Sequence, residues 1–249
     1  MASMMPELNW LQWSIAIITA FSIGLTKTGI PGLSVLFIPL MAEVFPARAS
    51  TGIVLPMLMF ADIFAVAYYR KHAVWPHLFK LMPWTAIGIV MGYLALGRVD
   101  DAQLKPIIGA IILVMLLINF LLGHGREGTL IRNSRWFAIG MGIAAGVTTM
   151  MANVAGTIVS IYFLAMKLPK TEFIGTGSWF FLILNWFKVP FSMSLGLITI
   201  DSLQLNIIIF PAVALGALVG ILSLKRIPER KFGVIVQILA AISAASLFI

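Results

Sequence analysis

The chain of 249 residues contains no cysteine, only three histidines, and few charged side chains, which make up 10% of it. The absence of cysteine excludes disulfides, thiolate metal sites and a cysteine nucleophile. The three histidines lack the spacing of metal ligands, so we expect neither a metal site nor a cofactor. The scarcity of charge also argues against a soluble protein, because 61% of the residues are hydrophobic and the mean hydropathy is +1.04.

Apolar stretches of membrane length recur along the whole sequence. They cover residues 10–41, 52–69, 77–97, 106–123, 136–165, 173–190, 202–222 and 232–249. The loops between them are too short for a soluble domain, so residues 1–249 are predicted to form a single all-α, polytopic membrane domain. The first stretch follows a segment without lysine or arginine, and we therefore expect no cleavable signal peptide there.

The two halves of the chain share a weak internal similarity. An offset of 123 positions pairs Asp62 with Asn185 and Pro46 with Pro169. Offsets of 122 and 128 pair Gly24 with Gly146, Thr26 with Thr148, Gly88 with Gly216, and Gly92 with Gly220. Since these matches occur in the same order in both halves, they predict two repeats, at about residues 10–123 and 136–249.

The first and fifth apolar stretches are each too long for one membrane crossing. If either is divided at its polar interruption, each of the two pieces is too short to cross. Residues 10–41 would extend about 48 Å as one helix, against about 30 Å for a hydrocarbon core. Polar and glycine-rich sequences interrupt both, "TKTGIPG" from Thr26 and "AGVTTMMANVAGT" from Ala145. Irregular backbone at membrane depth must be buried or line a cavity. Each repeat is therefore predicted to be a broken, re-entrant helical hairpin followed by three transmembrane helices, with a full crossing as the alternative.

The lysines and arginines of the loops test this arrangement. If every stretch crossed once, nine would lie on one side and six on the other, which is hardly a bias. If the first and fifth stretches return to the side they entered from, the distribution becomes twelve against three. That is a strong positive-inside signal, and it requires the two repeats to be inverted. The net charge of +8 is thus a topology signal, and we do not expect a nucleic-acid partner.

Inverted repeats with breaks at matching positions indicate a secondary transporter whose site lies at the breaks, near the midplane. A helix that restarts after a break directs N–H groups and its positive dipole end into the cavity, so an anion is favoured. The predicted substrate-binding residues are Thr26, Lys27, Thr28, Gly29 and Gly32 in the first break and Thr148, Thr149, Asn153, Gly156 and Thr157 in the second. Asp62 and Asn185 lie mid-segment, where they are predicted to carry a proton or organise the site.

Several of these residues have structural alternatives. Lys27 could anchor a helix at the membrane interface, and Asp62 could form a packing hydrogen bond instead of carrying a proton. Lys188, beside a tryptophan at a segment end, is predicted to extend toward the interface. The motifs "GIVMG" from Gly88 and "GALVG" from Gly216 are predicted to let helices pack closely.

The glycine- and threonine-rich first stretch, together with "FPARASTGI" and "LPKTEFIGTGS" in corresponding places, resembles the sulfite exporter TauE/SafE family, also described as the TSUP permeases. The resemblance covers nearly the full chain. It implies transport of sulfite, organosulfonates such as sulfoacetate, or related sulfur anions across the bacterial inner membrane. The residues themselves indicate an anion transporter, whereas the sulfur comes from the resemblance alone. Proton coupling is expected if Asp62 carries a proton, and the coupling ion itself is not readable from the sequence.

Other function classes remain to be weighed against this transporter. An anion channel, or a permease for another small carboxylate or inorganic anion, is the main alternative. An enzyme is not expected, because the polar residues within the apolar stretches contain no nucleophile with a base and no metal constellation. The expected partners are the small anion and the lipid bilayer, and the oligomeric state stays open, a homodimer included.

Overall fold

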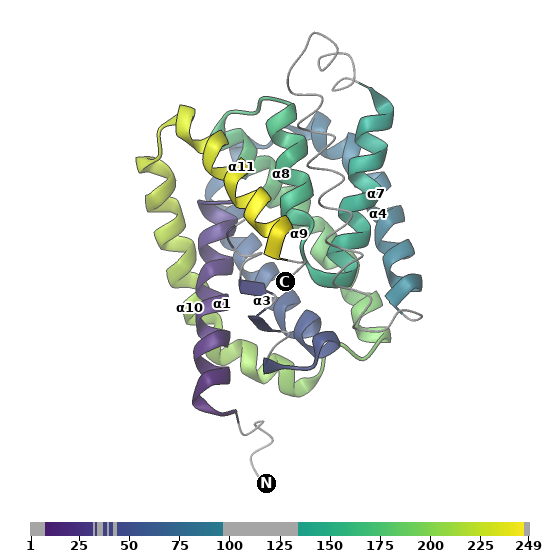
Figure 1. Cartoon of the computed structure of the whole chain (residues 1–249), viewed down its shortest axis with the longest axis vertical. Coiled ribbons are helices and arrows are strands. Elements are labelled where there is room, and N and C mark those ends of the chain that lie inside the picture. The colour runs from purple at the N-terminus through teal and green to yellow at the C-terminus, as the bar shows by residue number, and fades with distance from the viewer. Residues whose placement is uncertain are drawn as a thin grey trace.

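The computed structural model describes residues 8–31, 33, 37–38, 40–41, 44–96 and 134–246 (Figure 1). Regular structure in these ranges is entirely helical, without a strand, in agreement with the predicted all-α class. The predicted segment at residues 106–123 lies outside the described residues.

The helices described in the first half are α1 (Trp10–Thr28), α3 (Ala47–Tyr69), the 3-10 turn η1 (Arg70–His72) and α4 (Trp75–Leu96). A capping box starts α1: Asn9 Oδ1 accepts a hydrogen bond from the Gln12 N–H at 2.9 Å, and the Gln12 side chain accepts one from the Asn9 N–H at 3.0 Å. Pro46 immediately precedes α3, where its fixed backbone angle and missing N–H are no disadvantage.

The second half forms α7 (Arg135–Ala152), α8 (Ala155–Ala165), α9 (Lys170–Ser194), α10 (Ile200–Arg226) and α11 (Glu229–Ser246). Helix α9 follows Pro169, as α3 follows Pro46. Helix α10 begins with a second capping box, in which the Thr199 hydroxyl accepts from the Ser202 N–H at 3.1 Å.

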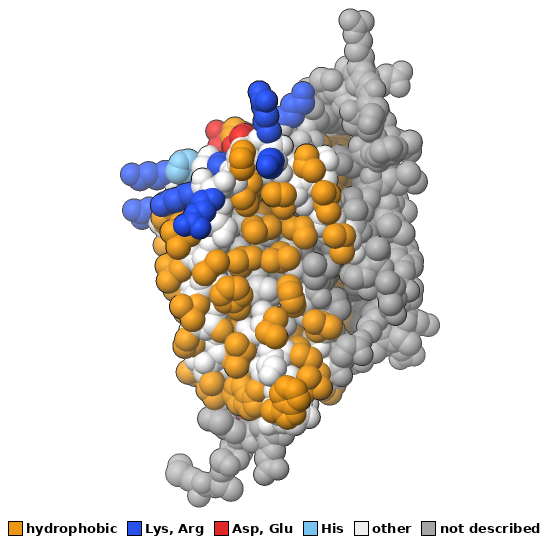
Figure 2. All heavy atoms as spheres, turned by 60° about the vertical axis from the view of Figure 1, so that its left-hand side comes forward, with side chains coloured by type: hydrophobic (Ala, Val, Ile, Leu, Met, Phe, Trp, Pro, Cys, Tyr) orange, Lys and Arg blue, Asp and Glu red, His pale blue; other side chains and the backbone are white. Residues whose placement is uncertain are grey.

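The outer surface of the helices is apolar. Three described helices are long and apolar enough to cross a membrane: Ala49–His72, Trp75–Leu96 and Ile200–Arg226. Large side chains such as Trp136, Ile200 and Phe79 are 80%, 72% and 68% exposed. Figure 2 shows hydrophobic side chains covering the flank of the molecule below a cap of lysines and arginines. A surface of this kind is compatible with lipid and not with water, and the protein is a multi-pass membrane protein.

The backbone breaks in the second half where the sequence predicts it. Asn153 ends α7 in the left-handed conformation, with φ of 58°, and α8 starts two residues later. At 1.5 Å per residue, α7 extends about 27 Å but α8 only about 16 Å. Arg135 at the start of α7 and Met166 just after α8 line a common surface cavity with His77. The beginning of α7 and the end of α8 therefore lie at the same end of the molecule.

The chain after α1 runs back along that helix. The Thr19 hydroxyl donates to the carbonyl of Phe37 at 3.3 Å, and Gln12 Nε2 donates to the carbonyl of Val44 at 2.9 Å. Val44, the later of the two carbonyl residues, is thus bonded to Gln12, the earlier of the two positions in α1. By residue 44 the chain has returned to the level at which α1 began.

Glycines bring two helix pairs into backbone contact. In the pair α1 and α10, a Cβ atom at Gly24 would collide with the carbonyl of Val213. In the pair α4 and α7, a Cβ at Gly88 would collide with the carbonyl of Ile143, and one at Gly146 with that of Thr85. Gly216 and Gly220 are equally crowded by the partner helix, and a Cβ at Gly92 would lie 2.9 Å from Met150 Cβ and 3.0 Å from the Val147 carbonyl oxygen. The predicted packing role of both glycine motifs is confirmed.

Helices α3 and α9 pack in opposite directions through the middle of the protein. Gly52, near the start of α3, lies against Leu197 just after α9, while Gly175, near the start of α9, lies against Tyr69 and His72 at the end of α3. Their central residues therefore face each other, and these include Asp62 and Asn185.

The basic loops meet at one end of the molecule, as the charge count predicts (Figure 2). Lys170 Nζ donates to the carbonyls of Leu224 and Ile227 at 3.1 and 2.7 Å. Trp179 Nε1 donates to the carbonyl of Arg70 at 3.4 Å. These bonds connect α9 with the end of α10 and with η1, which follows α3.

Candidate functional site

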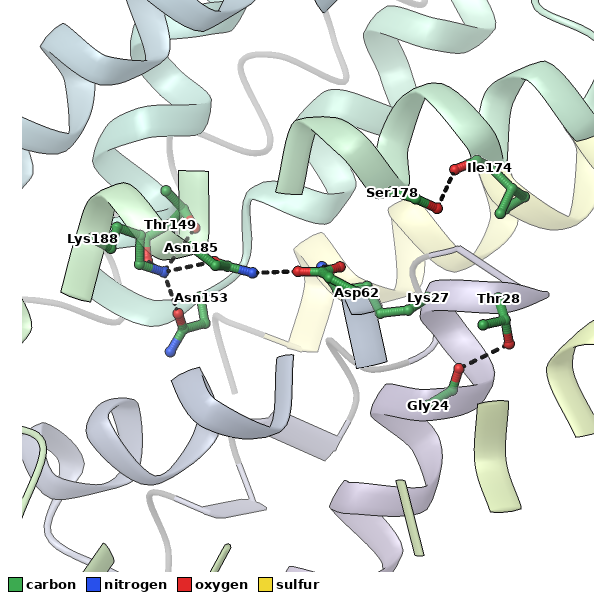
Figure 3. A network of polar contacts seen from close by, with 10 residues as sticks. All are labelled: Gly24, Lys27, Thr28, Asp62, Thr149, Asn153, Ile174, Ser178, Asn185 and Lys188. Carbon is green, nitrogen blue, oxygen red and sulfur yellow. Dashed lines mark hydrogen bonds and ion pairs between the residues drawn. The ribbon is translucent and has the colours of Figure 1, made fainter. Parts of the chain in front are cut away.

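A carboxylate and a lysine form an ion pair in the centre of the helix bundle. Lys27 Nζ lies 2.8 Å from Asp62 Oδ1. The other carboxylate oxygen, Oδ2, accepts a hydrogen bond from Asn185 Nδ2 at 2.7 Å (Figure 3). Asp62 is completely buried, and Lys27 is only 10% exposed. Both oxygens of this buried carboxylate thus have a partner, as a buried charge requires.

A second lysine lies on the other side of Asn185. Lys188 Nζ donates to the Thr149 carbonyl at 2.9 Å, the Thr149 hydroxyl at 3.1 Å and Asn153 Oδ1 at 2.6 Å. It also lies 3.4 Å from Asn185 Oδ1. A chain of contacts therefore runs from Lys188 through Asn185 and Asp62 to Lys27 (Figure 3). The prediction that Lys188 extends to the membrane interface is wrong, since the residue is 1% exposed. The end of α7 supplies carbonyl and side-chain oxygens that satisfy the ammonium inside the protein.

Helix geometry explains why these side chains converge. Lys27 occupies the last turn of α1, and Thr149 the last turn of α7, so the ends of both broken helices reach the same centre. Asp62 and Asn185 lie in the middle of two antiparallel helices. Lys188 follows Asn185 by three residues, which places it on the same face of α9.

A cavity of about 60 Å³ adjoins the ion pair. Because one water requires about 10–15 Å³ by this measure, it has room for about four waters or one small anion. Its polar lining residues are Thr26, Lys27, Thr149, Asn153, Ser160, Ser178 and Asn185. Its apolar walls include Phe163, Phe173 and Phe181, and Lys27 Nζ lies 3.9 Å from the centroid of the Phe181 ring.

The amino-terminal end of α8 also faces this cavity. Gly156, the second residue of α8, is part of the lining. Val154, which precedes the first residue of α8, forms no side-chain cap on the helix. The first N–H groups of a helix and its dipole attract negative charge. Lys27 and the start of α8 thus present positive potential to the same small space.

The structure brings together part of the predicted set of site residues. Six predicted residues line the cavity, namely Thr26, Lys27, Thr149, Asn153, Gly156 and Asn185. Asp62 lies behind Lys27 and holds its ammonium. Gly32 lies outside the described residues.

The other predicted residues have different surroundings in the structure. The Thr28 hydroxyl donates to the carbonyl of Ala217 at 2.7 Å, and Gly29 is in contact with Gly220, so both face α10. The Thr148 hydroxyl donates to the Ala144 carbonyl of its own helix at 2.8 Å. Thr157 is buried and does not line the cavity. Neighbouring residues of a helix point in directions about 100° apart, so a break can present only some of its hydroxyls to one cavity.

Sequence reasoning missed Lys188 and several residues that line the cavity, among them Ser160, Ser178 and Phe181. A signal for Lys188 was present, since it lies one helical turn from Asn185, which the repeat had already selected. The serines and the phenylalanine had no such signal. Within the ranges that the structure describes, no group of three or more histidine, aspartate or glutamate residues could hold a metal ion.

A family model for the sulfite exporter TauE/SafE matches residues 16–247. The chain belongs to the sulfite exporter TauE/SafE family. The match spans both breaks and every residue of the central cluster, and it confirms the resemblance seen in the sequence. Membership in the TauE/SafE family makes the protein a membrane transporter of sulfur-containing anions, a class that consists of transporters and not of enzymes. No curated protein and no solved structure matches the chain.

Proposed function

We propose that this TauE/SafE protein is a secondary transporter of sulfite or a small organosulfonate such as sulfoacetate, which binds in the cavity between Lys27 and the start of α8. One observation carries the proposal. The ammonium of Lys27 lines the cavity, while the central cluster contains two lysines for one carboxylate. With all three side chains ionised, the cluster has one uncompensated positive charge, which an anion in the cavity would neutralise.

The lining of the cavity fits the oxygens of such an anion. Lys27 supplies the charge, and the first N–H groups of α8, next to Gly156, supply directed donors. The aromatic walls exclude water, which strengthens the attraction between an anion and the ammonium. A volume of about 60 Å³ suits an inorganic anion or the sulfonate group of a larger one.

Two inverted repeats give this site its alternating access. Several pairs of features support the inversion. Helices α3 and α9 are antiparallel, and the glycine contacts of α1 with α10 have counterparts in those of α7 with α4. The chain doubles back along α1 by residue 44, and α7 and α8 likewise begin and end at one end of the molecule. Each hairpin is re-entrant, and the two open toward opposite sides of the membrane.

The basic end of the protein faces the cytoplasm. Lysines and arginines of the loops after α3, α8 and α10 gather there, which is the distribution that the positive-inside rule associates with cytoplasmic loops (Figure 2). Together with the family, this favours a location in the bacterial inner membrane.

Protons drive the transport through Asp62. The carboxylate holds the Lys27 ammonium at 2.8 Å, so it competes with any anion that approaches Lys27. Protonation of Asp62 removes its charge and leaves the ammonium for the anion. Proton and anion therefore bind together, and the pH gradient acts on the anion equilibrium.

Transport into proteoliposomes tests the function. The wild-type protein should take up sulfite with saturable kinetics, in competition with sulfoacetate and not with acetate. Lys27→Ala should weaken the apparent affinity about tenfold to a hundredfold, because a hydrogen bond between charged groups is worth about 1.5–3 kcal/mol. Lys27→Arg should also impair it, since the planar guanidinium is bulkier than an ammonium.

The control is Lys71→Ala, which removes the same charge from an exposed residue of the basic end. It should leave the affinity unchanged. A flux that rises linearly with sulfite concentration would indicate the channel instead, and competition by acetate as strong as by sulfoacetate would point to a less selective anion permease. Wild-type affinity in folded Lys27→Ala would refute the site.

A further inference from the structure

The surroundings of Lys188 differ from those of Lys27. Four oxygen atoms converge on its ammonium: the Thr149 carbonyl at 2.9 Å, the Thr149 hydroxyl at 3.1 Å, Asn153 Oδ1 at 2.6 Å and Asn185 Oδ1 at 3.4 Å. An ammonium has three N–H donors, so these acceptors use all of them. Lys188 does not line the cavity, and no donor remains for an anion. The four oxygen atoms around it are all acceptors, which is the environment that a cation requires.

The position of these oxygens in the fold supports this conclusion. Thr149 belongs to the last turn of α7, where carbonyl groups lack partners within the helix and carry the negative end of the dipole. The left-handed turn at Asn153 ends the helix here and directs the Asn153 side chain to the same point. Ends of broken helices and side-chain oxygens are the ligands by which transporters hold a small cation.

We infer that these four oxygens form a pocket for a monovalent cation, which the ammonium of Lys188 fills in this protein. The oxygens are all neutral and the carboxylate of Asp62 lies beyond Asn185, so a single positive charge matches the pocket better than a double one. A sodium ion is the free cation that fits it, once the lysine is removed. The protein would thus hold a cation permanently where another transporter would bind one from solution.

This pocket is connected to the ion pair. The amide of Asn185 accepts from Lys188 through Oδ1 and donates to Asp62 through Nδ2. A cation in the pocket therefore orients the amide whose other end holds the Asp62 carboxylate. The pocket itself does not depend on the proposed function, but its consequence does: with the pocket filled by its own side chain, anion transport should not require sodium.

Sodium rescue of a lysine variant tests the pocket. Wild-type protein, Lys188→Ala and Lys188→Met are purified in detergent, in parallel, in sodium chloride or in choline chloride, and melting temperatures are compared without any transported anion. The wild type should melt at the same temperature in both salts. Lys188→Ala should melt lower in choline and recover in sodium, by about 3–6 °C when sodium exceeds its Kd tenfold.

Matched variants define the specificity. Lys80→Ala, which removes an exposed lysine, should show no difference between the salts. In Lys188→Ala combined with Asn153→Ala, the sodium effect should be lost, because one of the oxygens is missing. Recovery of monodisperse Lys188→Ala or Lys188→Met in sodium but not in choline would also support the pocket.

Three results would overturn the inference. Neither variant is recovered in either salt, or both melt identically in sodium and choline, or methylammonium restores the melting temperature while sodium does not. The last result would assign the four oxygens to an ammonium group alone. None of these measurements uses sulfite, so they leave the anion site at Lys27 to its own experiment, and a failure of sulfite transport would leave the sodium effect standing.

Discussion

Asp62→Asn tests whether a carboxylate and the transported anion compete for one lysine. In the structure, Lys27 Nζ is 2.8 Å from Asp62 Oδ1, and it also faces the cavity beside Phe181. The variant keeps the size of the side chain and still offers an oxygen to its neighbours, but it removes the negative charge. An anion that reaches Lys27 then no longer has to displace a carboxylate.

The expected effect follows from the contact that is released. A hydrogen bond between charged groups is worth about 1.5–3 kcal/mol, and each 1.4 kcal/mol is a factor of ten in affinity. Asp62→Asn should therefore bind sulfite about tenfold to a hundredfold more tightly than the wild type. Because asparagine does not titrate, the variant should also lose the dependence of uptake on the pH gradient. Asn185 occupies the corresponding position of the second half, so an amide is compatible with this location.

Two measurements check this prediction. Titration calorimetry of the purified protein gives the affinity for sulfite, and uptake into proteoliposomes with and without a pH gradient gives the coupling. The matched control is Asp201→Asn, the same chemical change at an exposed residue in the first turn of α10, which should alter neither. If Asp62→Asn binds sulfite as weakly as Lys27→Ala, Asp62 organises the site and does not compete. Unchanged proton-driven uptake would reduce its role to packing.

Two further predictions concern the architecture. Since the chain has no cysteine, single cysteines at positions 71 and 230 can be labelled without background, and both should react only from the cytoplasmic side; labelling of either from outside would contradict the proposed orientation. Gly146→Ala should lower the melting temperature by several degrees, because its Cβ would collide with the carbonyl of Thr85 and overpacking costs about 1–3 kcal/mol. Gly140→Ala on the same helix has nothing within 4 Å and should be neutral, so equal melting temperatures of the two variants would argue against the close packing of α4 and α7.

The internal repeat was the most informative feature of the sequence. It paired Asp62 with Asn185 from their positions alone, and in the structure their side chains are 2.7 Å apart. This works because equivalent positions of two antiparallel central helices meet where the helices cross. The break in the second half was equally predictable, because polar and glycine-rich sequence within an apolar run at membrane depth requires backbone that is buried in protein or lines a cavity.

Side-chain direction within the breaks was not predictable. Thr26 and Thr28 look equivalent in "TKTGIPG", yet Thr26 lines the cavity and Thr28 binds the backbone of α10. Which of them faces the cavity depends on the rotation of α1 against α10, and that is fixed by glycine contacts with residues nearly 200 positions later. The prediction that Lys188 extends toward the membrane interface was wrong for a related reason. The apolar pattern places the end of its segment at residue 190, whereas α9 continues to Ser194 and is closed by the turn that packs against Gly52.

The pairing of α1 with α10 has a consequence for the synthesis of the protein. Helix α1 ends at Thr28 and α10 begins at Ile200, so 171 residues must be made before the two can meet. At about 5–20 residues per second, roughly 10–30 s pass before α10 is made and can pack against Gly24 of α1. Throughout that time the Thr28 hydroxyl has no Ala217 carbonyl to bind, and Gly24 lacks the α10 backbone that later packs against it. Insertion into the membrane therefore precedes assembly, and the helices made last complete the packing of the helix made first.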